Sequence, residues 1–254
     1  MKVKKILVSQ PKPANVEKSP YFELSQKYGV EIDFRKFIKI EGVPAKEFRK
    51  DKISILEHTA IIMTSRNSVD HFFRVCKEMR IDVPDTMKYF CVSEAIAFYL
   101  QKYVQFRKRK IFHGKQNFTQ LMDLIKKHKD EKFLLPCSDI HKQEFSEQLE
   151  VAGIHYNKAI IYRTLASDLS DVDIQEYDLL IFFSPSGVKS LFKNFPDYKQ
   201  EDALIAAFGP TTVSAVEQDG LVLNIKAPTK TAPSMAMAIE QHLEELKKAS
   251  RKKK

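Results

Sequence analysis

The 254-residue chain contains no tryptophan, only three cysteines and only seven glycines. Cys76, Cys91 and Cys137 are odd in number and far apart, so the sequence predicts neither a disulfide framework nor a zinc site. The longest apolar runs, 179–183 and 203–208, are far shorter than the roughly 18 residues of a membrane-spanning helix. The N-terminus also lacks the apolar core of about 7 residues or more that a secretory signal needs. We therefore expect a cytoplasmic protein with reduced cysteines and no membrane partner.

Positive charge is concentrated at the C-terminus. The formal net charge is +9, and six lysines and arginines lie within residues 247–254. The rest of the chain is close to neutral, apart from a short basic run at Arg107–Lys110. This distribution predicts a disordered basic tail over 247–254 and argues against a nucleic-acid partner. It leaves a mild preference for anionic ligands.

Short apolar segments alternate with amphipathic ones along most of the chain. The last helix is expected at about 233–248, and two longer extended segments at 32–40 and 156–164. Strands separated by helices of this length are typical of parallel sheets with crossover helices on both faces. The expected strands of this kind are 6–8, 60–63, 88–92, 110–113, 132–136, 177–183, 203–208 and 221–225.

The sequence contains an internal repeat. Ile62–Val69 aligns with Ile181–Val188, which places Ser65 on Ser184, and residues 91–96 align with 207–212. A third pair of segments, 5–29 and 132–153, precedes these units, and each segment ends at a glycine. Three strand–helix units in the same order indicate two homologous α/β domains.

The positions of the third pair predict how the two domains are connected. We expect a discontinuous domain of residues 1–36 plus 165–246 and a continuous domain of residues 37–164. The fold class is then α/β, with two similar parallel-sheet domains of the Rossmann or flavodoxin type. Segments 32–40 and 156–164 would join them as a two-stranded antiparallel ladder. Ligands of open α/β sheets bind beyond the carboxyl ends of the strands, which we expect to face an interdomain cleft. Those ends carry Ser9, Ser65, Ser93, Ser138, Ser184 and Gly209.

Several of these segments resemble motifs of the uroporphyrinogen-III synthases. Phe182–Val188 is similar to that family's Ser-Pro-Ser-Gly motif, and Ala207–Thr212 to its Gly-Pro-Thr-Thr segment. Thr64–Val69 resembles the version of the first motif in the other domain. Ala227–Thr229, Leu134–Pro136 and Ile161–Thr164 have counterparts in the same order, so the resemblance covers about residues 4–245.

The resemblance implies a cofactor-free, monomeric enzyme that converts linear hydroxymethylbilane into uroporphyrinogen III. The reaction loses water and inverts the last pyrrole ring. Tyr162 corresponds to the family's candidate proton donor, and a free tyrosine, with a pKa near 10, is protonated at neutral pH. From the sequence alone, Tyr162 could equally be an aromatic residue that packs where the chain crosses between domains.

The substrate carries eight carboxylates, so binding requires many hydrogen-bond donors. Backbone amides at helix N-termini, together with serine and threonine hydroxyls, supply such donors. The same side chains could instead serve only as helix caps. We expect substrate contacts from Ser9, Ser65, Arg66, Asn67, Ser93, Ser138, Ser184, Ser186, Gly187, Gly209, Thr211 and Thr212.

Some positions depart from the family pattern. Gln10 stands where the family usually has arginine, residues 93–96 lack the usual glycine and threonine, and Cys137–Ser138 replace a frequent Arg-Gly pair. These differences leave open a non-catalytic paralogue that binds tetrapyrroles or other anions and has a regulatory role. The chain also lacks a dinucleotide fingerprint, a phosphate loop, a Gly-x-Ser-x-Gly elbow and histidines at metal-binding spacing, so we expect no cofactor and no metal.

Overall fold

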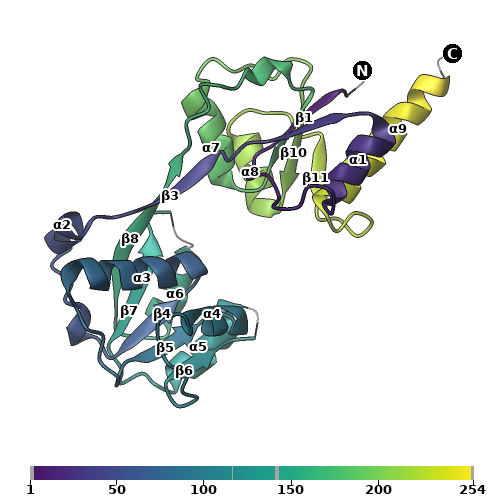
Figure 1. Ribbon diagram of the computed structural model, residues 1–254. Helices are drawn as coiled ribbons and strands as arrows, with labels where there is room; N and C mark the ends of the chain where they lie inside the picture. Colours follow the sequence, from purple (N-terminus) through teal and green to yellow (C-terminus); the bar gives the residue numbers. More distant parts are fainter. Residues whose placement is uncertain (1–2, 116, 141–142, 253–254) are drawn as a thin grey trace. The chain divides into compact units, whose positions relative to one another are not determined.

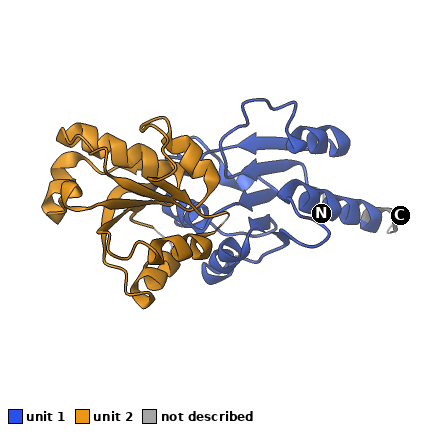
Figure 2. Cartoon of the chain, turned by 90° about the horizontal axis from the view of Figure 1, so that it is seen from below, with its two compact units in different colours: residues 1–39, 165–254 blue, residues 40–164 orange. Residues whose placement is uncertain are grey.

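The computed structural model describes residues 3–115, 117–140 and 143–252 (Figure 1). The chain divides into two compact units, which are coloured separately in Figure 2. Unit 1 comprises Met1–Lys39 and Leu165–Lys254, and unit 2 comprises Ile40–Thr164. Within the described ranges, no helix is both long enough and apolar enough to cross a membrane.

Unit 1 is built on a parallel sheet with helices on both faces. Helices α1 (Pro20–Tyr28) and α9 (Met235–Lys252) cover one face, and α7 (Pro185–Asn194) and α8 (Pro210–Gln218) cover the other. The central strand β9 is buried along its whole length, as a strand covered on both faces must be. In the described residues, the strand order is β11 (Ile225–Ala227), β10 (Leu204–Phe208), β9 (Leu179–Phe182), β1 (Lys5–Val8) and β2 (Glu31–Phe34).

Unit 2 repeats this architecture. Helices α2 (Ala45–Phe48), α3 (Arg66–Met79) and α4 (Glu94–Leu100) lie on one face, and α5 (Phe118–Lys126) and α6 (Gln143–Val151) on the other. In the part of the chain that is described, the sheet order is β3 (Ile38–Gly42), β8 (Tyr156–Ala166), β7 (Phe133–Ser138), β4 (Ala60–Met63), β5 (Lys88–Cys91) and β6 (Ile111–His113). The pairs from β8 to β6 are parallel. Short 3-10 turns occur at Arg49–Asp51, Ile55–Glu57 and Ile174–Glu176.

The five strands of the unit 1 sheet have the same order as five of the six strands in the sheet of unit 2. The order β11-β10-β9-β1-β2 in unit 1 corresponds to β6-β5-β4-β7-β8 in unit 2. This is the order of the flavodoxin-like fold, in which the first strand lies between the second and the third. The equivalent of β1 in unit 2 is β7, which comes late in that unit, so the two copies are circular permutations of each other. The two-domain α/β class predicted from the repeat is therefore confirmed.

The strands β3 and β8 are neighbours at the edge of the six-stranded sheet. Hydrogen bonds of 3.0 Å from the Val43 amide to the Ile161 carbonyl and 2.9 Å from the Ser167 amide to the Phe37 carbonyl show that they run antiparallel. The extended segment expected at 32–40 consists of two strands, because β2 ends at Phe34 and β3 begins at Ile38. Phe37 interrupts them, since its buried ring packs edge-on against Phe182 at 5.8 Å.

Helix α9 extends to Lys252, so it includes most of the segment for which we expected a disordered tail. Residues 253 and 254 lie outside the described part of the chain. Lysine, arginine and alanine are good helix formers, and this favours continuation of a helix that is already anchored. The anchor is a contact with α1, where Lys27 binds Glu240 at 2.6 Å and Tyr28 donates to Glu244 at 3.1 Å.

Candidate functional site

In each unit, hydroxyl side chains lie at the point where the strand order reverses. In unit 1 this point is between β1 and β9, and Ser9 and Ser184 closely follow these strands. In unit 2 it is between β7 and β4, where Ser138 ends β7 and Ser65 lies just beyond β4. Open α/β sheets bind ligands beyond the carboxyl ends of the strands at such reversals.

A hollow of about 270 Å³ opens at the reversal point of unit 2. The Tyr162 hydroxyl, from strand β8, lies 3.3 Å from the Ser65 hydroxyl, and both residues line the hollow. These two residues are 97 positions apart in the sequence. The remaining lining residues are Thr64, Val92, Leu135, Cys137, Ser138, Ile140 and Phe145.

Tyr162 is 7 % exposed, and its environment keeps the phenol protonated. Burial raises the pKa of Tyr162 above its ordinary value, the hydrogen bond with Ser65 acts in the opposite direction, and the nearby Cys137 and Asp139 raise it further. The hydroxyl can therefore donate a proton or a hydrogen bond at neutral pH.

The imidazole of His71 stacks on the Tyr162 ring, with centroids 5.0 Å apart and planes at 22°. The Arg74 Nε–H donates to His71 Nδ1 at 3.1 Å, so Nδ1 carries no proton and the neutral ring has its hydrogen on Nε2. Burial, and then the Arg74 charge, lower the pKa of His71. No sequence motif predicted this pair, because only the fold brings α3 against β8.

Arg74 joins three elements of unit 2. Its guanidinium donates to the Val43 carbonyl at 2.8 Å, to the Ile161 carbonyl at 3.0 Å and to the Glu78 carboxylate at 2.5 Å. A Cβ on Gly42 would lie only 2.6 Å from the guanidinium, so a larger residue at position 42 would displace the Arg74 side chain from this place. These bonds fix the position of α3, and with it His71, relative to β8.

The N-terminus of α3 is closed by its own side chains. Ser65 accepts a hydrogen bond from the Ser68 amide at 3.0 Å, and the Ser68 hydroxyl in turn accepts from the Ser65 amide at 3.0 Å. The Thr64 amide also donates to the Ser68 hydroxyl at 3.2 Å. This reciprocal capping box uses donors that would otherwise be available to a ligand.

The corresponding end of α7 in unit 1 lacks this second cap. Ser184 accepts from the Gly187 amide at 3.2 Å, but Gly187 occupies the position of Ser68 and has no side chain to return the bond. A Cβ on Gly187 would lie 3.5 Å from the Ser184 hydroxyl and 3.7 Å from the Ser9 hydroxyl. The two hydroxyls therefore converge beside Gly187 in the first turn of α7, where no side chain returns a capping bond.

The N-terminus of α8 is a second helix end in unit 1. Gly209 precedes it with φ of 85° and ψ of 151°, a conformation that is essentially restricted to glycine. No atom lies within 4 Å of a Cβ position on Gly209, so the backbone is accessible there. Thr211 is exposed, whereas Thr212 is 1 % exposed and would contribute mainly its backbone amide.

The other residues expected at the site have weaker links to the hollow at Tyr162 and to the helix ends of unit 1. The guanidinium of Arg66 lies 5.3 Å from the Tyr99 ring centre, and neither Arg66, Asn67 nor Ser93 lines the hollow. Ser93 precedes α4 without a side-chain capping bond, and Ser186 is half-buried in the first turn of α7. Ser138 is 5 % exposed, donates to Asp139 at 2.7 Å and lies 3.3 Å from the Thr164 hydroxyl.

No group of three or more histidine, cysteine, aspartate or glutamate side chains among the described residues could hold a metal ion. His141 lies outside these residues. The thiols of Cys76, Cys91 and Cys137 are buried and free.

The fold and these sites define a two-unit α/β protein of the flavodoxin-like type, with hydroxyls and helix ends at the strand reversals. A family model described as "Uroporphyrinogen-III synthase HemD" matches residues 19–237. The chain therefore belongs to the uroporphyrinogen-III synthase family.

Solved structures of this family share the fold. The chain is similar to uroporphyrinogen-III synthetase from Helicobacter pylori, with 17% identity, a TM-score of 0.60 and coverage of 95% of this chain and 99% of that one. It is also similar to a mutant uroporphyrinogen III synthase from the extremely thermophilic bacterium Thermus thermophilus, with 16% identity, a TM-score of 0.57 and the same coverage of both chains. None of the curated proteins matches.

Membership of the family gives the activity. The protein is a cyclising hydro-lyase of tetrapyrrole biosynthesis that converts hydroxymethylbilane to uroporphyrinogen III with inversion of the D ring and loss of water. No finding supports the alternative of a non-catalytic paralogue.

Proposed function

We propose that Tyr162 donates the proton that releases water from hydroxymethylbilane. The observation that supports this assignment is the position of its buried but protonated hydroxyl, 3.3 Å from Ser65 in the hollow at the strand reversal of unit 2. A general acid must reach the leaving oxygen directly, and a hydroxyl that lines a hollow meets this requirement.

Release of water breaks the bond between the terminal methylene carbon of the substrate and its hydroxyl oxygen. The Tyr162 proton joins that oxygen, and water leaves. The positive charge that remains is shared with the pyrrole nitrogen. Because the D ring is inverted, its α-carbon that already carries a bridging methylene forms the first new carbon–carbon bond. The older bond at that carbon then breaks, and the released methylene joins the ring's other α-carbon. That carbon loses a proton, which can return to the tyrosinate. The net change is the loss of one water molecule.

We assign His71 as a positioning residue for Tyr162. The stacked ring restricts rotation of the phenol, and the bond from Arg74 fixes the orientation of the imidazole. The neutral state of His71 also matters, because a cation stacked on the phenol would favour tyrosinate, which has no proton to donate.

The open helix ends of unit 1 supply donors for the substrate carboxylates. The hydroxyls of Ser9 and Ser184 converge above Gly187, and the first amides of α8, at Thr211 and Thr212, have no acceptor within their own helix. Carboxylates are favoured at helix N-termini by both the free amides and the helix dipole. Self-capping of α3 assigns unit 2 a smaller share of this binding.

We further propose that the protein acts as a cytoplasmic monomer without a nucleic-acid partner. The free, buried cysteines and the concentration of positive charge at one end of the chain support this assignment. Size-exclusion chromatography with light scattering tests the oligomeric state, and a dimer at micromolar concentration would contradict it.

Substitution Tyr162→Phe tests the proton donor. We expect kcat to fall about 10- to 100-fold, the lower part of the range for loss of a general acid, because the pyrrole nitrogen assists departure of the hydroxyl. The rate is measured as formation of isomer III from freshly prepared hydroxymethylbilane, separated from the isomer I that forms without enzyme. The matched control is Tyr156→Phe on the same strand, whose hydroxyl binds Glu150 at 3.0 Å outside the hollow. A Tyr162→Phe rate within twofold of the Tyr156→Phe rate would remove Tyr162 from this role.

A further inference from the structure

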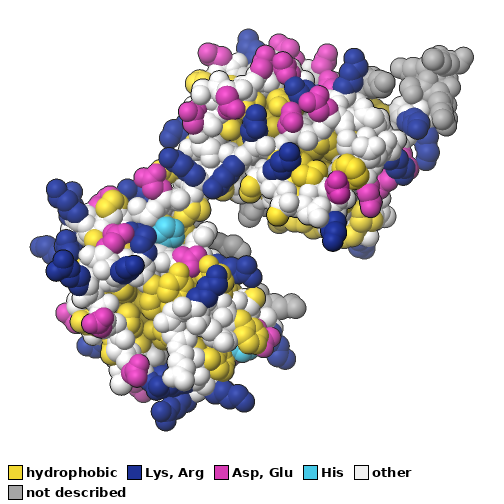
Figure 3. Space-filling view, viewed as in Figure 1, with side chains coloured by type: hydrophobic (Ala, Val, Ile, Leu, Met, Phe, Trp, Pro, Cys, Tyr) yellow, Lys and Arg dark blue, Asp and Glu magenta, His cyan; other side chains and the backbone are white. Residues whose placement is uncertain are grey.

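Unit 2 contains a second, larger pocket on the face of its sheet that carries α3. Its volume is about 740 Å³, within the range of about 300–1,000 Å³ that small-molecule sites occupy. It shares no lining residue with the hollow at Tyr162. Hydrophobic side chains gather on this face of unit 2 (Figure 3). Its apolar lining residues are Phe73, Cys76, Ile81, Val83, Pro84, Met87, Val104 and Ile111.

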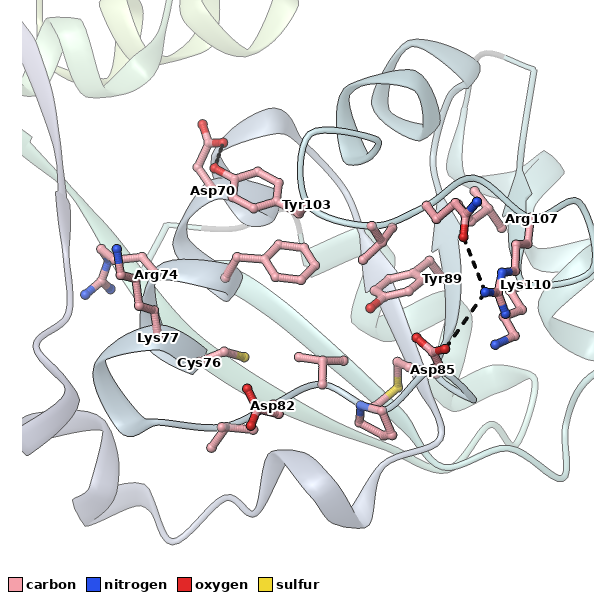
Figure 4. A pocket seen from close by; sticks show the side chains of 18 residues that line it. Asp70, Arg74, Cys76, Lys77, Asp82, Asp85, Tyr89, Tyr103, Arg107 and Lys110 are labelled. Carbon is pink, nitrogen blue, oxygen red and sulfur yellow. Dashed lines mark hydrogen bonds and ion pairs between the residues drawn. The ribbon is translucent and has the colours of Figure 1, made fainter.

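Tyr89 presents a hydroxyl to this pocket. The residue is only 4 % exposed, and its side chain projects into the pocket (Figure 4). No hydrogen bond from this hydroxyl to the described residues is seen, and it is not among their fully buried polar atoms without a partner, so it is open to water or to a ligand in the pocket. Burial raises the pKa of Tyr89, so the group remains a donor at neutral pH. A ligand oxygen would satisfy it.

Two stacked aromatic rings form a wall of the pocket. The rings of Phe73 and Tyr103 lie 4.5 Å apart with an interplanar angle of 3°. The Tyr103 hydroxyl donates to Asp70 at 2.7 Å, and this bond holds the Tyr103 ring in place. A flat ligand ring can pack against such a surface.

The cationic groups lie at the two ends of the pocket (Figure 4). At one end lie Arg74, whose guanidinium is already bonded within the protein, and the exposed Lys77. At the other end are Arg107 and Lys110. Arg107 donates to the exposed Gln105 side chain at 3.3 Å, and its ion pair with Asp85 is long, at 3.9 Å, with the Asp85 side chain 91% exposed. Such a pair is weak, so Arg107 and Lys110 remain able to bind an anion.

Only two of the four residues in the basic run Arg107–Lys110 line the pocket. Arg107 and Lys110 line the pocket, whereas the intervening Lys108 and Arg109 are exposed and do not. Asp82 and Asp85 also line it, but both are exposed, where solvent and salt screen their repulsion of an anion.

We propose that this pocket binds a small planar aromatic carboxylate. The ligand ring lies along the wall formed by Phe73 and Tyr103, and its acidic group faces Arg107 and Lys110. The Tyr89 hydroxyl donates a hydrogen bond to a ligand oxygen. The site is separate from the catalytic assignment of Tyr162 and does not depend on it.

Fluorine NMR of the full chain with 4-(trifluoromethyl)benzoate as the probe tests this proposal. We expect saturable broadening of the probe signal, and weaker binding of the neutral 4-(trifluoromethyl)benzamide by about fivefold or more, because it lacks the charge recognised by arginine and lysine. Absence of saturable binding up to millimolar probe would overturn the proposal, as would equal binding of the neutral amide.

Paired charge variants locate the probe. The double variant Arg107→Gln/Lys110→Gln should weaken binding about fivefold, whereas Lys108→Gln/Arg109→Gln removes the same charge outside the pocket and should change it less than about twofold. Tyr89→Phe should weaken binding by about threefold through loss of one hydrogen bond. Equal losses in the two double variants would show non-specific charge attraction and refute the site.

A further variant separates this site from the catalytic hollow. Tyr162→Phe should leave probe binding unchanged, whatever its effect on turnover. Loss of binding in Tyr162→Phe would place the probe in the hollow and refute the second site. Thermal melting of each variant confirms that it is folded before the titration.

Discussion

Substitution Gly187→Ser tests whether the open end of α7 binds substrate, because unit 2 shows what serine does at this position. Ser68, at the equivalent position of α3, closes that helix through bonds of 3.0 Å in both directions with Ser65. At residue 187 a Cβ has no neighbour closer than 3.5 Å, so the Cβ of a serine makes only ordinary van der Waals contacts there, one of them with the Ser184 hydroxyl. It should form the same capping box with Ser184.

The expected effects on stability and on binding have opposite signs. One added hydrogen bond contributes about 0.5–1.5 kcal/mol, and replacing glycine in a helix contributes up to about 0.5 kcal/mol more. The free energy of unfolding should therefore rise by about 1–2 kcal/mol, which corresponds to a Tm increase of about 2–8 °C for a protein of this size. If the new side chain displaces one carboxylate, loss of a hydrogen bond to a charged group, about 1.5–3 kcal/mol, should raise KM about 10- to 100-fold.

Two measurements check this prediction together. Thermal or urea unfolding reports stability, and initial rates of isomer III formation over a range of hydroxymethylbilane concentrations report KM. The matched control is Ser68→Gly, which opens α3 and should lower stability without a comparable gain in substrate affinity. A more stable Gly187→Ser protein with unchanged KM would refute the assignment of this helix end to substrate binding.

Three further predictions concern single side chains. Burial and Arg74 lower the pKa of His71, so the stabilisation by neutral His71 is complete above about pH 6.5 and is lost as the pH falls toward the lower pKa of the folded protein. His71→Phe should therefore reduce the fall in the free energy of unfolding, measured with urea, between pH 7 and 5. An equal fall in the variant and the unsubstituted protein would contradict this. His71→Phe keeps an aromatic ring on Tyr162 and should retain more turnover than His71→Ala, whereas equal losses would argue against stacking as the positioning contact. Burial raises the pKa of the thiols to about 12 at Cys76 and Cys91 and about 11 at Cys137, so iodoacetamide at pH 8 should label them only after unfolding; rapid labelling of the folded protein would show that these sites open.

Local patterns in the sequence were sufficient to predict the architecture. The alternation of apolar strands with amphipathic helices defines parallel sheets, and the repeat that aligns Ser65 with Ser184 requires the same strand order twice. The capping serines could also be identified, because a cap bonds to an amide only two or three residues away. The end of α9 was misjudged because a run of lysines is compatible with both solvated coil and helix, and the contact with α1 favours the helix.

The tertiary structure decided which of these groups meet. Tyr162 reaches Ser65 across 97 residues, and His71 stacks on Tyr162 only because Arg74 ties α3 to two strands from other parts of the chain. The pocket of Tyr89 is likewise formed by segments of unit 2 that show no common motif. The sequence by itself determines which segments form strands and helices and in what order, since periodicity and capping are local properties of the chain. Distances between side chains on different elements, and the pKa values that burial changes, exist only after the elements pack.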